Sequence, residues 1–256
     1  MVSAAGQGRG TMDHPCATVG RSTEGRHMGK YETLDVGGRA ARLYVAGDLK
    51  PGAPGVVVLH AWWGLNDDVI AYADRLAAAG FAVTAPDMFG GQVASTIEEA
   101  ERLSGAAESP DSEPSVESIA LAAVDDLATR LGPTSRLGVV GFSFGAAYAT
   151  LIPAERDRLV ASVVYYGVYT GPHIEQSSAA VLGHFAESDQ FESDEGIAEL
   201  EGSLRSAGRE VTINRYPGTG HWFAEPSRDA YRAEAADLAF GRTVDFLQEH
   251  LSPRTL

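Results

Sequence analysis

The run LGVVGFSFGAAYA at Leu137–Ala149 constrains the fold of this chain more than any other feature. An apolar, β-branched segment ends at Gly-Phe-Ser-Phe-Gly and passes directly into small residues that suit a closely packed helix. A strand that turns so tightly into a helix holds its central residue, Ser143, in a strained backbone conformation, and glycines on both sides leave room for it. The pattern predicts a nucleophile elbow, with Ser143 exposed at the strand tip and the backbone N–H of Phe144 directed at a developing oxyanion. G-x-S-x-G alone also matches ordinary turns, but the strand before it and the helix after it favour the elbow.

Composition favours a single α/β domain that acts on a small molecule. A chain of 256 residues, 44% of them hydrophobic, can bury one large core. The formal net charge of −15 argues against nucleic acid or an anionic membrane surface as a partner, because phosphates would be repelled. The single cysteine, Cys16, allows no internal disulfide.

The N-terminal stretch differs in composition from the rest of the chain. Residues 1–29 are rich in Gly, Ser, Thr, Arg and His and contain no apolar run of signal-peptide length, so they are expected to form a disordered tail before a folded domain at 30–256. No segment reaches the roughly 18 uninterrupted apolar residues of a membrane-spanning helix, which favours a cytoplasmic protein. A monomer and a homodimer are both compatible with the sequence.

Short apolar runs alternate with helical patterns along the domain. The first two runs are joined by Gly37-Gly38 and predict a hairpin, and the others predict right-handed crossovers in a mostly parallel, eight-stranded sheet flanked by helices. The predicted strands are Tyr31–Val36, Arg42–Ala46, Val56–His60, Ala82–Ala85, Leu137–Gly141, Val160–Tyr166, Ala180–Ala186 and Val211–Tyr216.

Helix signals fall between these strands. Asn66 or Asp67 can cap the first predicted helix, and the stretch Gly90–Pro114 looks like a surface excursion with one helix and no chemistry. The predicted helices run from Asn66 to Ala79, from near Pro114 to Arg130, from Ser143 onward, from Ser193 to Ser206 and from Ser227 to Glu249.

A serine hydroxyl needs a base, and a histidine base needs an acid that fixes its tautomer. His221 lies in the glycine-rich loop after the last predicted strand, at the edge where catalytic loops of open α/β sheets gather, and we expect it to be the base. His173 lies in a long connection, His184 is expected to be a buried structural residue, and His250 lies at the end of the last helix.

The acid should follow the preceding strand, Ala180–Ala186. Glu187, Asp189 and Asp194 compete for this position. Asp194 suits the first turn of the next helix, and Asp189 is our choice.

The remaining site residues come from aromatic segments. The backbone N–H of Trp62, in the loop after Val56–His60, is the expected second oxyanion donor beside Phe144. Aromatic residues flank all three motifs, although each alone could be ordinary core packing, and Trp63, Trp222 and Phe223 are expected to form an apolar substrate pocket. No metal or organic cofactor is required by this chemistry.

From about Lys30 to its C-terminus the chain resembles the dienelactone hydrolase family, a compact branch of the α/β-hydrolase fold without a large lid domain. The resemblance implies a triad of Ser143, Asp189 and His221 with backbone donors at Trp62 and Phe144. The matching blocks, in order, are VVLHAWWGLN at Val57–Asn66, AVTAPDM at Ala82–Met88, GVVGFSFGA at Gly138–Ala146, YYG at Tyr165–Gly167, GHFAESDQF at Gly183–Phe191 and YPGTGHWF at Tyr216–Phe223.

The chain departs from the best-known members of that family at the nucleophile and at the substrate-binding positions. Those members use a cysteine where this chain has Ser143, and a glutamate where it has Ala61. They bind the substrate carboxylate with two arginines, which here correspond to Glu225 and to the segment Phe89–Gly91. The loss of both guanidinium groups argues against dienelactone itself, and Glu225 is expected to repel an anion.

These patterns predict a serine hydrolase of carboxylic esters or lactones that forms an acyl-enzyme on Ser143. Two alternatives stay open. The same triad could hydrolyse amides or thioesters, or the fold could serve as a non-catalytic ligand-binding protein, although a pure binder would not need all three triad residues.

Overall fold

A computed structural model describes residues 28–252 of the protein. The predicted N-terminal tail lies outside the described residues up to residue 27. The first strand begins at Lys30. No helix within the described part of the chain combines the length and apolarity needed to cross a membrane.

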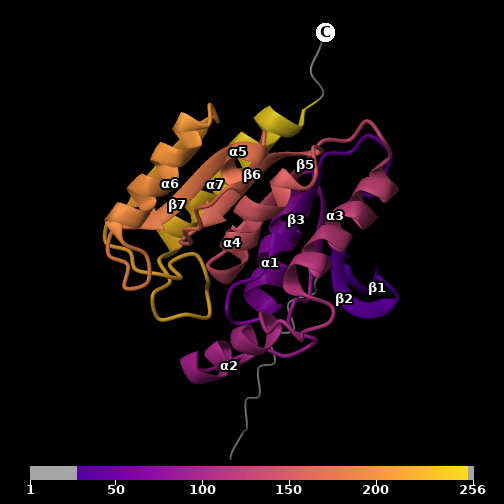
Figure 1. Cartoon of the computed structure of the whole chain (residues 1–256), viewed down its shortest axis with the longest axis horizontal. Helices are drawn as coiled ribbons and strands as arrows, with labels where there is room; N and C mark the ends of the chain where they lie inside the picture. The colour runs from indigo at the N-terminus through magenta and orange to yellow at the C-terminus, as the bar shows by residue number, and fades with distance from the viewer. Residues whose placement is uncertain (1–27, 253–256) are drawn as a thin grey trace, which may run out of the picture.

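The protein contains the eight-stranded, mostly parallel sheet that the sequence predicts, with strand order β1-β2-β4-β3-β5-β6-β7-β8 (Figure 1). The β1–β2 hairpin and the β2–β4 pair are antiparallel, and all other neighbours are parallel. Gly37 and Gly38 form the hairpin turn with φ of 61° and 86°, which glycine adopts readily. The strands are β1 (Lys30–Val36), β2 (Arg39–Ala46), β3 (Gly55–Leu59), β4 (Ala82–Pro86), β5 (Leu137–Phe142), β6 (Leu159–Tyr165), β7 (Ala180–Ala186) and β8 (Val211–Tyr216).

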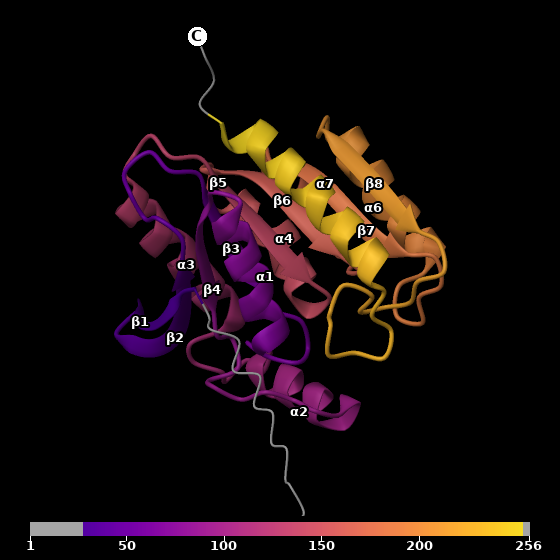
Figure 2. The same cartoon turned by 180° about the vertical axis from the view of Figure 1, so that it is seen from behind.

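Helices cover both faces of this sheet. On one face α1 packs on β4 and α7 packs on β6 and β7, and on the other face lie α3, α4 and α6 (Figures 1 and 2). The central strands are therefore buried on both sides, and every residue of β3, β5 and β7 is buried, as expected for parallel strands with apolar sequences. The helices are α1 (Asp67–Ala78), α2 (Ile97–Ala107), α3 (Val116–Leu131), α4 (Phe144–Leu151), α5 (His173–Gln176), α6 (Asp194–Ser206) and α7 (Ala233–Leu251), with a 3-10 turn η1 (Ile152–Ala154) after α4.

Local side-chain chemistry sets where several of these helices begin. Asn66 caps α1 by accepting a hydrogen bond from the N–H of Val69, as predicted, and Ser193 caps α6 in the same way. The last helix, however, begins at Ala233 and not at Ser227. Ser227 donates its N–H and its hydroxyl to the Asp68 carboxylate of α1, which holds residues 227–232 in a loop.

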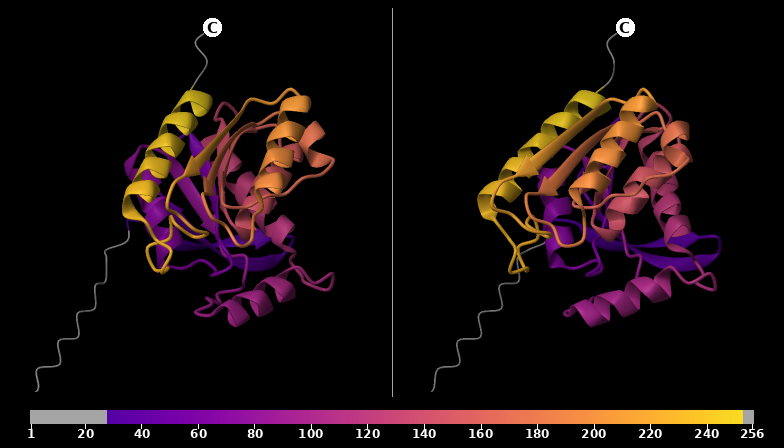
Figure 3. Two further views of the ribbon diagram at one scale, coloured as in Figure 1. Left: turned by 90° about the vertical axis from the view of Figure 1, so that its left-hand side faces the viewer. Right: turned by 60° about the vertical axis from the view of Figure 1, so that its left-hand side comes forward.

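The segment between β4 and α3 lies apart from the two main helix layers. Its single helix, α2, crosses one end of the molecule beside the loops that leave the parallel strands (Figure 3). Glu108, at the end of α2, accepts a hydrogen bond from Tyr148 of α4, and the N–H of Ala94 donates to Trp63. These contacts attach the segment to the part of the fold that carries the candidate site.

Candidate active site

Ser143 lies at a strained turn between β5 and α4. Its φ of 46° and ψ of −110° place it in a region that residues other than glycine rarely adopt. A Cβ atom on Gly145 would lie 2.5 Å from the carbonyl oxygen of Leu59 and 2.7 Å from that of His60. The close approach explains why glycine is required here, and it brings the start of α4 against the loop that follows β3.

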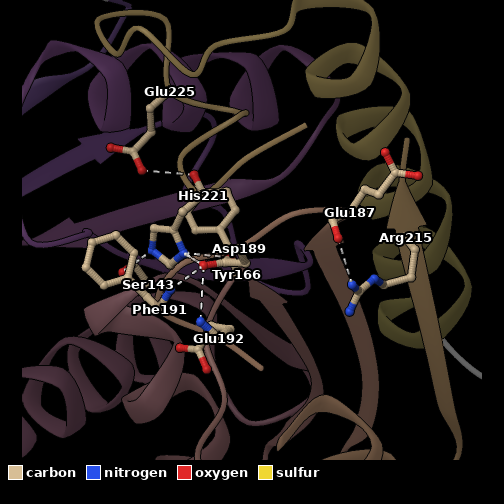
Figure 4. A network of polar contacts seen from close by, with 9 residues as sticks. All are labelled: Ser143, Tyr166, Glu187, Asp189, Phe191, Glu192, Arg215, His221 and Glu225. Carbon is tan, nitrogen blue, oxygen red and sulfur yellow. Dashed lines mark hydrogen bonds and ion pairs between the residues drawn. The ribbon is translucent and has the colours of Figure 1, made fainter. Parts of the chain in front are cut away.

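Ser143, His221 and Asp189 form a continuous chain of hydrogen-bond contacts (Figure 4). Ser143 Oγ lies 2.9 Å from His221 Nε2, and His221 Nδ1 lies 2.8 Å from Asp189 Oδ2. Because the carboxylate accepts a hydrogen bond from Nδ1–H, Nε2 is left without a proton and can accept from the serine hydroxyl. The three residues come from the ends of β5, β7 and β8, so the parallel sheet brings them to one edge.

The environment of Asp189 favours its ionised form. Burial raises the pKa of this carboxyl, but hydrogen bonds from His221 and from the N–H groups of Phe191 and Glu192 outweigh burial and lower the pKa below its ordinary value. The loop after β7 therefore supplies an ionised acid that orients the imidazole.

The competing acids serve local structure. Glu187 accepts a hydrogen bond from the N–H of Gly218, and it lies with Arg215 at a distance from the imidazole (Figure 4). Asp194 lies in the first turn of α6 and pairs with Arg215. Neither acid has a recorded contact with His221.

The other histidines after Ser143 are also placed away from its hydroxyl. His184 is fully buried in β7, as predicted, and burial lowers its pKa to about 3. His173 lies in the short helix α5, and His250 lies in the last turn of α7.

The predicted oxyanion donors lie where the elbow meets the loop after β3. Phe144 is the first residue of α4, and Trp62 lies in that loop. The loop is held by His60, a role that no sequence motif indicated. His60 Nε2 accepts the N–H of Met88 at 3.0 Å, and burial lowers the pKa of His60 to about 4, which keeps the ring neutral and able to accept. A histidine at the end of an apolar strand is the only sequence signal for this anchor.

A cavity of about 1040 Å³ borders the histidine side of the site. Trp63 and Trp222, two of the three residues predicted to form the substrate pocket, are among its lining residues. Ser95 and Ile97, at the start of α2, line it as well, so part of the Gly90–Pro114 segment, where we expected no chemistry, borders the cavity. The acidic and basic lining residues are Glu187, Asp189, Glu192, Asp194, Glu195, Arg228 and Asp229, and burial raises the pKa of Glu192 to about 7.

Aromatic side chains surround the imidazole, but not all of them lie where the sequence suggested. The ring of Phe191, 41% exposed, lies 4.8 Å from the His221 ring and 5.1 Å from that of Trp222. Phe223, expected in the pocket, is fully buried and packs on Tyr216 in the core.

Glu225 behaves differently from the expectation drawn from the sequence. It is 2% exposed, and burial raises the pKa of its carboxyl to about 8. The carboxyl is therefore largely neutral at pH 7, and the expected repulsion of an anion by Glu225 was wrong.

Backbone strain marks the same region. Among the described residues other than glycine, three have positive φ: Ser143, Tyr166 and Trp222. All three lie in or directly beside the site, which is where such strain is typically retained.

Comparisons with known proteins identify the family of the chain. The model of the dienelactone hydrolase family matches residues 41–251. Protein usf of Aquifex pyrophilus is 30% identical over 88% of this chain and 100% of its own length. A protein of Azospirillum brasilense assigned as a carboxymethylenebutenolidase is 30% identical over 78% of this chain and 88% of its own.

A solved structure shares the same fold. The crystal structure of a dienelactone hydrolase-like promiscuous phosphotriesterase from metagenomic libraries superposes with a TM-score of 0.75 at 23% identity, and it covers 88% of this chain and 98% of that one. With the family match over most of its length, the chain belongs to the dienelactone hydrolase family of α/β-hydrolases.

Proposed function

We propose that the protein is a serine hydrolase of carboxylic esters or lactones. The observation that carries the proposal is the contact of Ser143 Oγ with His221 Nε2 at 2.9 Å, at a strained turn, with Asp189 on the far side of the imidazole. This is the arrangement that a serine needs to become a nucleophile.

The first half of the proposed reaction acylates the enzyme. Ser143 Oγ attacks the carbonyl carbon as His221 Nε2 takes its proton, and the backbone N–H groups of Trp62 and Phe144 stabilise the oxyanion. The ester C–O bond then breaks, and His221 returns the proton to the leaving alkoxide oxygen. In a lactone, this oxygen stays attached to the acyl group.

The second half returns the free enzyme. Water attacks the acyl carbon as His221 takes one of its protons, and the carboxylic acid leaves as Ser143 Oγ recovers a proton. Asp189 keeps a proton on Nδ1 of His221 throughout the reaction and stabilises the imidazolium. The substrate is a small molecule, uncharged at the reacting end, and the reaction needs neither a nucleic acid nor a membrane partner.

The first experiment measures turnover of p-nitrophenyl esters of increasing acyl length, and of an anionic dienelactone-like lactone, by the protein and by Ser143→Ala. The expected result is hydrolysis of short neutral esters that falls at least about 10³-fold in the variant. Labelling of Ser143 by a fluorophosphonate, lost in Ser143→Ala, accompanies it. Ester turnover that survives in folded Ser143→Ala would refute the proposal.

Two other results point to the alternatives. Labelling without ester turnover would favour an amide or thioester substrate. A folded protein that is neither labelled nor active would favour a ligand-binding protein.

A further inference from the structure

A buried hydrogen bond behind His221 joins two segments of the site that are far apart in the sequence. Tyr166 Oη donates to Glu225 Oε1 at 2.9 Å (Figure 4). Tyr166 directly follows β6, and Glu225 lies four residues beyond His221 in the same loop. The Tyr166 side chain is fully buried and Glu225 is 2% exposed, so water does not compete for this bond.

The Tyr166 ring forms part of the surface against which the imidazole rests. Its centroid lies 5.0 Å from that of His221 and 5.5 Å from that of Phe223. The N–H of Tyr166 donates to His184 O at 2.8 Å, which ties its backbone to β7 in spite of a φ of 38°.

The next residue, Gly167, fixes the tyrosine against the elbow. A Cβ atom on Gly167 would lie 2.6 Å from Ala146 Cβ and 2.7 Å from Ser143 O. Tyr166 and Gly167 therefore contact both the nucleophile and the base. A strained backbone conformation such as that of Tyr166 persists only where the surrounding contacts hold it in place.

Few charged groups face Glu225. Burial raises the pKa of Glu225 most, the hydrogen bond from Tyr166 lowers it, Asp68 of α1 raises it and Arg228 of the same loop lowers it. The Asp68 carboxylate already accepts from Ser227, and the Arg228 guanidinium lies 4.1 Å from the Trp63 ring centroid. Glu225 Oε2 has no hydrogen-bond partner among the described residues. A neutral carboxyl fits this site. An ionised carboxylate would be a buried charge that accepts a hydrogen bond from Tyr166 alone among the described residues.

We propose that Glu225 and Tyr166, through their buried hydrogen bond, form a positioning pair that holds the His221 ring in reach of Ser143. The inference rests on the proposed function. Ionisation of Glu225 would place a charge beside Asp68 inside the packing of the loop, displace the loop and move the imidazole. Glu225 touches no reacting atom and acts through Tyr166 and the loop. Activity should therefore require the protonated acid and decline at alkaline pH.

The test compares Glu225→Gln and Glu225→Ala with the unmodified protein. Two rates are measured between pH 6 and pH 9.5: hydrolysis of p-nitrophenyl acetate, and labelling of Ser143 by a fluorophosphonate, which does not depend on knowing the natural substrate. Glu225→Gln keeps an acceptor for Tyr166 Oη and stays neutral at every pH. Glu155→Gln, which removes an exposed charge after η1, is the matched control.

The expected result is a loss in the unmodified protein that approaches tenfold per pH unit above about pH 8, where Glu225 ionises. Glu225→Gln should lack this loss, and the control should keep it. At pH 7, Glu225→Ala should lower kcat by roughly 10- to 100-fold with little change in KM, because a misplaced base slows the chemical step.

Two outcomes would overturn the inference: an alkaline loss in Glu225→Gln equal to that of the unmodified protein, or a folded Glu225→Ala with unchanged kcat. Folding is checked by circular dichroism and thermal unfolding. Labelling of the unmodified protein separates this failure from failure of the proposed function. If Ser143 is labelled and the Glu225 variants are indistinguishable from the unmodified protein, the positioning pair alone is wrong.

Discussion

Ser143, Tyr166 and Trp222 have backbone conformations that residues with a Cβ atom rarely adopt, at a cost of about 1–3 kcal/mol each. Such a cost persists only where the surroundings allow no alternative. Here those surroundings include tight approaches between backbone segments, of which Gly145 against the end of β3 is the clearest. The precision of the site therefore depends on glycines that carry no chemistry.

Gly145→Ala tests this dependence. The new Cβ would meet backbone oxygens of Leu59 and His60, which cannot move as a flexible side chain could. We expect a loss of stability of about 1–3 kcal/mol and a larger proportional loss of ester turnover, measured by chemical denaturation and kcat. Gly202→Ala, inside α6 with open space around it, should stabilise the protein by about 0.5–1 kcal/mol and serves as control. Equal effects of the two substitutions would contradict the argument.

At the scale of elements, α7 is attached to the sheet by a buried polar chain. Thr243 Oγ1 lies 2.9 Å from Tyr165 Oη and 3.0 Å from His184 Nε2, and His184 Nδ1 continues the chain to Tyr216 Oη at 2.7 Å. The three strands involved, β6, β7 and β8, lead into the loops that carry the site, and the one helix is α7. Each polar group in this network has a hydrogen-bond partner. The network therefore stabilises the fold only while all of its hydrogen bonds are intact.

Replacing Thr243 with valine keeps the shape and removes the shared hydroxyl. Two buried groups, Tyr165 Oη and His184 Nε2, lose a partner, and we expect the free energy of unfolding to fall by about 2 kcal/mol or more. Thr129→Val, on the exposed face of α3, should change it by less than about 0.5 kcal/mol. Urea denaturation measures the free energy of unfolding of both variants. Equal losses in Thr243→Val and Thr129→Val would show that the buried hydrogen bonds of Thr243 add no stability beyond that of an exposed threonine.

The start of α2 is a second element that the site uses. Ser95 and Ile97 line the cavity beside His221, although the sequence around them is polar and rich in Glu and Ser. Thr96 caps the helix and the N–H of Ala94 donates to Trp63, so this short segment is anchored at the site although α2 lies apart from the main helix layers (Figure 3). The segment that begins α2 thus forms part of one wall of the cavity.

For the whole molecule, charge is the dominant property. The net charge is −15, and acidic side chains outnumber basic ones around the cavity. We therefore expect an anionic substrate to be repelled by this field and not by Glu225, which is largely neutral at pH 7.

The field predicts a salt-dependent preference for neutral esters. At 0.01 M ionic strength, kcat/KM for p-nitrophenyl acetate should exceed that for mono-p-nitrophenyl succinate by about tenfold or more. The gap should narrow as the screening length falls from about 30 Å to about 3 Å at 1 M. Glu195→Gln at the cavity should narrow it at low salt, and Glu155→Gln should not. A ratio that does not change with salt would exclude electrostatic selection.

Much of the architecture was predictable because it depends on local patterns. The eight strands follow from short apolar runs, the hairpin from Gly37-Gly38, and the start of α1 from Asn66. The start of α7 was not predictable in this way, since Ser227 is held in the loop by Asp68, 159 positions earlier in the chain.

The sequence by itself determined the order of strands and helices, the strained serine turn and the family, because each depends on neighbouring residues or on motifs in a fixed order. Only the tertiary structure decided which aromatic residues face the cavity, that the start of α2 forms part of its wall, and that Glu225 is a neutral partner of Tyr166. These features depend on burial and on contacts between distant segments. A carboxyl group in water has its ordinary pKa, and only burial in the folded protein raises that pKa enough to leave the group neutral.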